Sequence, residues 1–322
     1  MSGVVQYQLP NIDLLLDRQS RPNYKVNHYH PELETEFILE KYIFSYTWWV
    51  KEFHLTSLKE IEGAQLPLCA AAYAPDADMP QLRVYLDYFV LLLLVEVMSD
   101  VSNAQAGQFD LDYMVNLLNA CSDNEPFDTS KQKDTLVHLA AKFARKCFPP
   151  LSPLYRYDAT QGTILYLQAA AQENYDRTNP SAFTVDSYLA HRRKVVAIHP
   201  VIAFNRWMSQ VKLSPEILQT PAFEGLLEST IDLIALPNDL ISYKKEKAQG
   251  EDIHNLVSVA MVDPAIPVKS GDIQAALDFA DILLETIDGN IVWQIDSRTV
   301  RYHVFETPEE RAQWLVSICI ED

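Results

Sequence analysis

The longest apolar run in the chain, Tyr88–Val95, constrains the fold more than any other stretch. It lies within a segment from about Gln81 to Asp100 that has a helical pattern, and Pro80 precedes it at a position suited to the first turn of a helix. A helix that is apolar on every face belongs in the middle of a protein. We therefore expect other helices to surround this one.

The same run is too short for a transmembrane helix. Asp87 and Glu96 bound it, and crossing a bilayer takes roughly 20 apolar residues. No basic segment followed by an apolar core begins the chain, so no signal peptide is expected. The four cysteines form no CxxC pair, which is typical of free thiols in a reducing compartment. These features predict a cytoplasmic protein without stable membrane insertion.

Helical patterns separated by prolines fill most of the chain, and alternating strand patterns are almost absent. The prolines join helices without dividing the chain into compositionally different halves. We therefore predict one all-α domain over residues 1–322, with an arm at 1–33 and a helical bundle at 34–322. Helices are expected at about 34–54, 56–61, 81–100, 109–121, 131–148, 160–176, 184–200, 201–210, 215–219, 222–249, 273–302 (with a break near Gly289) and 308–320.

The charge and glycine content exclude several function classes. A net charge of −18 repels nucleic acid, so no nucleic-acid partner is expected. The 8 glycines form no GxGxxG or GxxxxGK string, which disfavours a Rossmann domain and a P-loop. A small anionic substrate would need local cations or metal ions in so acidic a chain.

Three oxygen-bearing side chains stand four residues apart: Asn238, Ser242 and Glu246. Steps of four keep side chains on one face of an α-helix, about 6 Å apart along its axis. Such donors suit a hard cation such as Mg²⁺, and Lys245 could reach an anion held by that cation. The alternative is a solvated helix face. It fits poorly at the start of the motif, because the apolar residues Leu233–Leu236 lead directly into it.

A second acidic pair, Glu96 and Asp100, ends the apolar central helix and lies on one face of it. A carboxylate there costs desolvation unless water, a base or a metal compensates it, although both residues could simply emerge at the surface. The clustered cations are Arg192–Lys194 and Arg301, the latter followed by Tyr302. Surface salt bridges are the alternative for any single arginine.

Together these elements fit the ionisation of an allylic diphosphate. Two oxygen-bearing helices can hold divalent metals, and the basic residues can bind the polyanion that the metals bridge. Aromatic side chains around a dry cavity can stabilise a carbocation by cation–π contact.

Residues Asn238–Glu246 also resemble the NSE metal motif of microbial class I terpene synthases, in its NDxxSxxKE form, and Gly250–Val257 is similar to fungal members. Residues 73–100 resemble the stretch that leads into the family's Asp-rich motif. Residues 188–200 resemble the segment with the diphosphate-sensing arginine, here Arg192, which stands 46 residues before Asn238. Residues 293–302 resemble the final helix, which ends in an Arg-Tyr pair. The resemblance covers roughly residues 40–305.

The resemblance implies an all-α, single-domain helical bundle around a central apolar cavity, with three Mg²⁺ ions. The substrate it implies is farnesyl diphosphate, cyclised to a sesquiterpene hydrocarbon or alcohol, and homodimers are common in the family. The expected metal ligands are Glu96, Asp100, Asn238, Ser242 and Glu246; the expected diphosphate-binding residues are Arg192, Lys245, Arg301 and Tyr302; and we assign Phe89, Leu92, Leu93 and Trp293 to the cavity lining.

The chain departs from the family pattern at two places. Glu96 and Val97 stand where the first motif usually has Asp followed by Asp or Glu, and Val97 cannot bind a metal. Val195 and Ala197 stand where the sensor region often has Thr and Gly. A prenyltransferase is disfavoured, because such enzymes need a second Asp-rich motif. The first motif leaves open a non-catalytic or weakly active helical protein that binds a prenyl diphosphate or a protein partner.

Overall fold

The computed structural model of the protein describes residues 28–29, 31–33, 65–101, 111–128, 135–178, 183–250, 252–289, 291–296 and 299–304. The chain divides into two compact units. The α6 unit comprises Pro22–Thr178 and Ala197–Lys212, and the α13 unit comprises Met1–Arg21, Asn179–Val196 and Leu213–Asp322. Most of the expected arm, and the helices expected at 34–54, 56–61 and 308–320, lie outside the described residues. The single domain stays a prediction.

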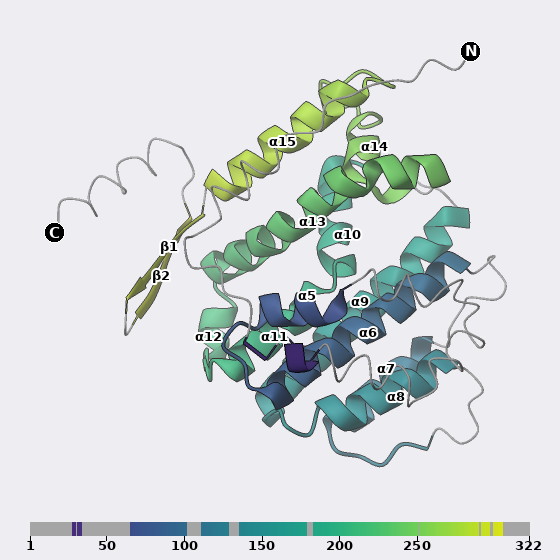
Figure 1. Ribbon diagram of the computed structural model, residues 1–322. Coiled ribbons are helices and arrows are strands. Elements are labelled where there is room, and N and C mark those ends of the chain that lie inside the picture. Colours follow the sequence, from purple (N-terminus) through teal and green to yellow (C-terminus); the bar gives the residue numbers. More distant parts are fainter. Residues whose placement is uncertain are drawn as a thin grey trace. The chain divides into compact units, whose positions relative to one another are not determined.

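The α6 unit is built around its longest apolar helix (Figure 1). The expected helix is confirmed as α6, Met79–Val101, with Pro80 in its first turn. Tyr85, Leu86 and Tyr88 are fully buried, because α5, α8, α9 and α11 all contact this helix. No described helix is long and apolar enough to cross a membrane. The described helices of this unit are α5 (Leu66–Tyr73), α6, α7 (Leu111–Ser122), α8 (Thr135–Cys147), α9 (Pro153–Thr178) and α11 (Ile198–Met208).

Helices α9 and α11 approach each other most closely at Gly162. A Cβ at this buried position would lie 2.9 Å from both the Cδ and the backbone N of Pro200. Pro200 itself lies in the first turn of α11, where a missing N–H is tolerated. The sequence predicts a helix over 184–200 that this proline ends or kinks. That helix already ends at Val195, and the next one begins at Ile198 with the proline in its first turn.

Ala197 lies between α10 and α11 with φ 59° and ψ 27°, which is left-handed backbone. A non-glycine residue in this region is strained, because its Cβ crowds the following carbonyl. The hydroxyl of Tyr88 in α6 donates a hydrogen bond to the Ala197 carbonyl at 3.0 Å. Ala197 is one of the positions where the family often has Gly, and the structure shows why glycine suits it.

The α13 unit is centred on the 29-residue helix α13, Pro221–Gln249. Thr220 caps its N-terminus and Gly250, at φ 76°, ends it. Pro237 lies inside the helix, directly before Asn238, and removes one backbone donor there. Figure 1 shows α15 running beside α13, and the two helices contact each other. The other described helices of this unit are α10 (Val185–Val195), α12 (Pro215–Leu218), η1 (Asp252–His254), α14 (Leu256–Ala260) and α15 (Ile273–Gly289).

The prediction of a helix from 273 to about 302 is wrong beyond Gly289. Strands β1, Ile291–Asp296, and β2, Thr299–Val304, form an antiparallel hairpin (Figure 1). The expected break near Gly289 is confirmed as the end of α15. The residues that follow are mainly β-branched or aromatic, including Ile291, Val292, Trp293 and Val300, and such residues favour strands. The register pairs Trp293 with Tyr302 and Gln294 with Arg301.

Candidate functional site

The expected metal motif lies on α13, which runs without interruption through Asn238, Ser242 and Glu246. Asn238 is exposed, and Ser242 and Glu246 are half-buried. Leu240 and Tyr243 face the other way and are fully buried in the core of the unit. The apolar residues thus anchor the helix and leave the oxygen-bearing residues accessible.

Asp239 is the buried centre of this region, with 1% of its surface exposed. Arg192 Nε donates to its Oδ1 at 2.9 Å, while the Tyr188 hydroxyl and, at 3.1 Å, the Leu256 N–H donate to its Oδ2. Burial raises the pKa of Asp239 above its usual value, against the opposing effects of Arg192, Tyr188 and the Leu256 amide. Asp239 therefore ties α10 and α14 to the motif helix.

Arg192, the expected diphosphate sensor, lies directly beside the motif. Its Nη2 donates a hydrogen bond to Asn238 Oδ1 at 2.8 Å, while its Nε is paired with Asp239. One planar guanidinium thus reaches two adjacent motif residues. The fold brings together an arginine and an asparagine that are 46 residues apart in the sequence.

Arg193 has a different partner from Arg192. Its guanidinium forms two hydrogen bonds with the buried Asp232, at 2.8 and 2.7 Å, and an ion pair with Glu228 at 2.8 Å. The hydrogen bonds to Asp232, opposed by burial, raise the pKa of Arg193. The cation cluster expected to bind an anion is therefore divided, because Arg193 fastens α10 to α13 within the protein.

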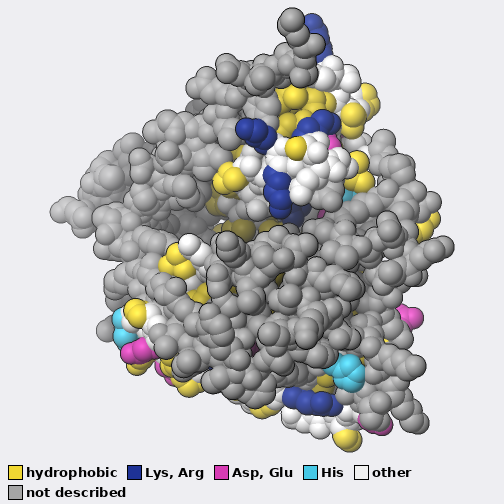
Figure 2. All heavy atoms as spheres, turned by 45° about the vertical axis from the view of Figure 1, so that its right-hand side comes forward, with side chains coloured by type: hydrophobic (Ala, Val, Ile, Leu, Met, Phe, Trp, Pro, Cys, Tyr) yellow, Lys and Arg dark blue, Asp and Glu magenta, His cyan; other side chains and the backbone are white. Residues whose placement is uncertain are grey.

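Glu246, at the end of the motif, is held by a neutral donor. Asn255 Nδ2 donates to Glu246 Oε2 at 2.9 Å. Lys247 is instead paired with Asp252, at 2.8 Å. Lys245 is exposed. In Figure 2, which brings the right-hand side of Figure 1 forward, several Lys and Arg side chains lie close together.

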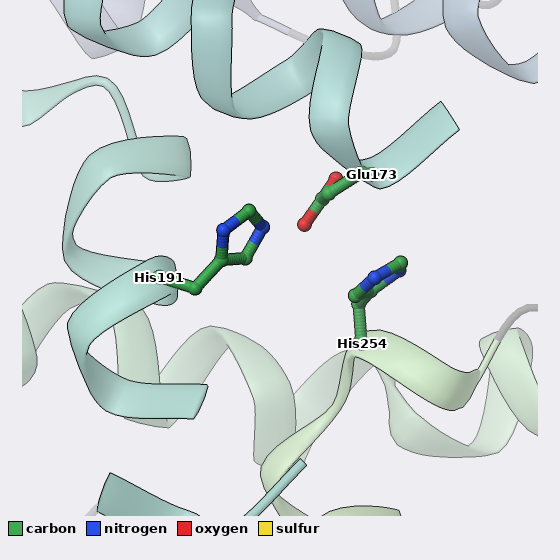
Figure 3. Close-up of side chains that lie close together, drawn as sticks. All are labelled: Glu173, His191 and His254. Carbon is green, nitrogen blue, oxygen red and sulfur yellow. The ribbon is translucent and has the colours of Figure 1, made fainter. Parts of the chain in front are cut away.

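Two histidines that the sequence did not single out lie beside this region. Figure 3 shows His191 of α10 close to His254 of η1, and their ring centroids are 5.9 Å apart. The ring of Phe183 lies 5.9 Å from that of His191 and 5.5 Å from that of His254. Nothing in the local sequence pattern joins residues so far apart. The contact arises because the fold places α10 beside η1.

The other expected site residues are placed less completely. Glu96 and Asp100 are in the last turns of α6, and their side chains lie outside the described part of the structure. The side chains of Trp293, Arg301 and Tyr302 also lie outside it, although their backbone belongs to the hairpin. Phe89, Leu92 and Leu93 are half-buried on α6, and Phe89 lies among the rings of Tyr73, Tyr85 and Tyr88. Their role in a cavity remains a prediction.

Comparison with known proteins finds relatives that are named as terpene-forming synthases. "Sesquiterpene synthase Agr1" of Cyclocybe aegerita is 25% identical over 268 residues, which cover 83% of this chain and 72% of that protein. "Delta(6)-protoilludene synthase" of Armillaria gallica is 27% identical over 223 residues, which cover 66% of this chain and 61% of that protein. The chain thus spans under two thirds of the length of the second relative.

Solved structures show the same fold. The linalool/nerolidol synthase of Streptomyces clavuligerus, in complex with 2-fluorogeranyl diphosphate, has a TM-score of 0.64 at 15% identity and covers 82% of this chain and 81% of its own. The germacradien-4-ol synthase of Streptomyces citricolor has a TM-score of 0.63 at 15% identity, with coverages of 84% and 83%. The expected all-α fold class is confirmed, with the hairpin as a local exception.

The family model described as "Terpene synthase family 2, C-terminal metal binding" matches residues 87–285. The matched region includes Glu96, Asp100, Arg192 and the whole of Asn238–Glu246, and it stops before the hairpin. It covers more than half of the chain. Terpene synthases are lyases, and the family is one of metal-binding proteins, as the motifs predicted. The chain belongs to terpene synthase family 2.

Proposed function

We propose that the protein is a Mg²⁺-dependent sesquiterpene cyclase that ionises farnesyl diphosphate and closes the resulting carbocation to a terpene hydrocarbon or alcohol. The observation that carries this proposal is the contact between Arg192 and Asn238. It joins an anion-binding side chain to an oxygen of a divalent-metal motif. The sesquiterpene synthases among the relatives support the choice of a C15 substrate.

The residues of α13 fit a hard divalent cation. Asn238, Ser242 and Glu246 offer an amide, a hydroxyl and a carboxylate oxygen, and Mg²⁺ prefers oxygen ligands. No cation in the described part of the chain forms an ion pair with Glu246, so its negative charge is available. Glu96 and Asp100 supply further carboxylates in this proposal, for three ions in all. When bound, Mg²⁺ supplies Lewis-acid stabilisation of the leaving diphosphate.

The protein's own cations orient the diphosphate. In this proposal, the Nη groups of Arg192 donate to diphosphate oxygens while its Nε stays paired with Asp239, so the guanidinium keeps its place during binding. Lys245, exposed on α13, adds a positive charge next to Glu246. Arg301 and Tyr302 are proposed as further donors. Local cations are needed because the net charge of −18 otherwise repels an anionic substrate.

The apolar helix α6 suits the hydrocarbon part of the substrate. Phe89, Leu92 and Leu93 are half-buried on it, and the rings of Tyr73, Tyr85 and Tyr88 lie around Phe89. We assign Phe89, Leu92, Leu93 and Trp293 to the cavity that excludes water from the carbocation. Aromatic rings stabilise such a cation through their electron-rich faces.

The proposal is tested by incubating the purified protein with farnesyl diphosphate and Mg²⁺. We expect a volatile C15 product by gas chromatography–mass spectrometry, and diphosphate release that EDTA stops. Glu246→Ala should abolish both. If geranyl, farnesyl and geranylgeranyl diphosphate all yield neither product nor diphosphate, the protein is not a cyclase. Calorimetric binding without turnover would then support the non-catalytic alternative.

A further inference from the structure

Asn255 is a completely buried polar side chain that touches the motif helix without belonging to the motif. Its Oδ1 accepts the N–H of Val257 at 3.0 Å, which caps the N-terminus of α14. Its Nδ2 donates to the Asp239 carbonyl oxygen and to Glu246 Oε2, both at 2.9 Å. The amide oxygen and both N–H groups therefore have partners.

These partners fix which way the amide faces. The Val257 N–H is a donor, whereas the Asp239 carbonyl and the Glu246 carboxylate are acceptors. A flipped amide would place donor against donor and acceptor against acceptors. Asn255 therefore presents N–H groups to α13. These hold the Glu246 carboxylate without adding a positive charge, which a lysine or arginine at this place would do.

A single nitrogen can reach both oxygens because of the geometry of a helix. Asp239 and Glu246 are seven residues apart, which is about two turns. Carbonyl groups point toward the C-terminal end of a helix, and side chains lean toward its N-terminal end. The two oxygens therefore approach each other, and Asn255 braces the part of α13 that carries Ser242 and Glu246.

Lys247, the cation that follows Glu246 in the sequence, is held elsewhere. Its Nζ pairs with Asp252 Oδ2 at 2.8 Å, and the Ser258 hydroxyl donates to the same oxygen. In the described part of the chain Glu246 has an ion pair with none of the lysines or arginines. Its Oε2 accepts from the uncharged amide of Asn255 instead.

We propose that Asn255 is a positioning residue for a metal ligand. By holding Oε2 it sets the rotamer of Glu246 and leaves Oε1 to the divalent cation. This inference rests on the proposed function, because it takes Asn238, Ser242 and Glu246 as the ligands. Outer-sphere groups of this kind, which orient a ligating carboxylate, commonly change metal affinity 10- to 100-fold.

The test uses variants that keep the cap of α14. Serine and aspartate both cap helices well, so Asn255→Ser and Asn255→Asp retain the bond to Val257. Neither keeps the amide nitrogen that donates to Asp239 and Glu246: the shorter serine has a single hydroxyl in its place, and aspartate sets a second carboxylate against Glu246. The probe is Mn²⁺ with inorganic diphosphate, followed by electron paramagnetic resonance and calorimetry on the full chain. We expect Mn²⁺ affinity to fall roughly 10- to 100-fold, most in Asn255→Asp.

Two controls separate the explanations. Ser258→Ala, also on α14, should bind Mn²⁺ as the wild type does. Asn255→Ser placed in a Glu246→Gln background should cause no further loss, because the ligand it positions is already removed. Unchanged affinity in Asn255→Ser, or an equal further loss in the Glu246→Gln background, would overturn this inference alone. If Glu246→Gln itself binds Mn²⁺ like the wild type, the proposed metal site fails as well.

Discussion

Arg192 and Asn238 are joined by a hydrogen bond of 2.8 Å between Nη2 and Oδ1. The same guanidinium pairs through Nε with Asp239, whose carboxylate is 2% exposed. Two neighbouring residues of α13 thus depend on one side chain of α10. A change at Arg192 should therefore affect both the stability of the unit and the binding of an anion.

Arg192→Lys should separate charge from geometry. Lysine keeps the positive charge but cannot donate in two fixed directions, so one of the two partners loses its donor. Leaving Asp239 less well satisfied should lower the free energy of unfolding by about 1–3 kcal/mol, measured by urea denaturation. Calorimetry should show weaker binding of inorganic diphosphate.

The matched control for this change is Arg206→Lys. Arg206 pairs with Asp158 at 2.7 Å between α11 and α9 and is 11% exposed, close to the 14% of Arg192. The Arg206→Lys variant should lose a similar amount of unfolding free energy and keep the diphosphate affinity of the wild type. Equal loss of diphosphate affinity in both variants would mean that Arg192 has no specific role.

Glu96→Asp tests the first acidic motif. Aspartate restores the residue type usual in the family and keeps the carboxylate, so activity over a Mg²⁺ titration should be preserved or raised. Glu96→Gln has the same size without the charge. Since outer-sphere changes alone cost 10- to 100-fold, loss of this ligand should lower kcat/KM by at least roughly 100-fold. An active Glu96→Gln enzyme would remove Glu96 from the ligand set.

Gly162→Ala should destabilise the contact between α9 and α11. The added Cβ would meet Pro200 at 2.9 Å, and the proline ring cannot turn away. Overpacking of this kind costs about 1–3 kcal/mol. Gly225→Ala is the control, because no atom lies within 4 Å of its Cβ and alanine favours a helix by about 1 kcal/mol. Urea unfolding should therefore give shifts of opposite sign.

The ion pair between Lys247 and Asp252 predicts a dependence of stability on pH. Burial raises the pKa of Asp252, but the hydrogen bonds from Lys247 and Ser258 outweigh it and bring the pKa below its usual value. A carboxyl whose pKa is lower in the folded than in the unfolded protein stabilises the fold at pH values above its unfolded-state pKa. This stabilisation is lost as the pH falls through the folded-state pKa. Asp252→Asn should flatten the acid limb of a plot of unfolding free energy against pH. An unchanged acid limb would show that the pair does not contribute.

The long helices could be predicted because their sequences are locally consistent. The apolar run at Tyr88–Val95 and the capped, proline-started segment at Thr220–Gly250 each favour one structure. The hairpin at 291–304 contradicts the predicted helix, because the β-branched and aromatic content of the segment favours strands despite its likeness to a final helix. At Ala197 the sequence indicated a departure from glycine, but only the structure shows left-handed backbone there.

The sequence predicts candidate ligands, which stay a prediction, and it does not indicate the residues that support them. The spacing of Asn238, Ser242 and Glu246 is visible on one helix. The roles of Asp239 and Asn255 depend on contacts from α10 and α14, and a buried polar residue gives no periodic signal. Such residues are found by asking which donors satisfy each buried oxygen once the helices are placed.

Pro237, one residue before Asn238, has a consequence for local opening. It has no N–H to donate to the Leu233 carbonyl, so α13 lacks one backbone hydrogen bond directly before the motif. The amide protons of the residues after Pro237 should exchange with solvent more readily than amide protons in the centre of the helix, because opening the helix here costs less free energy. If Asn238 binds a ligand as proposed, that binding should slow exchange first at these amide protons.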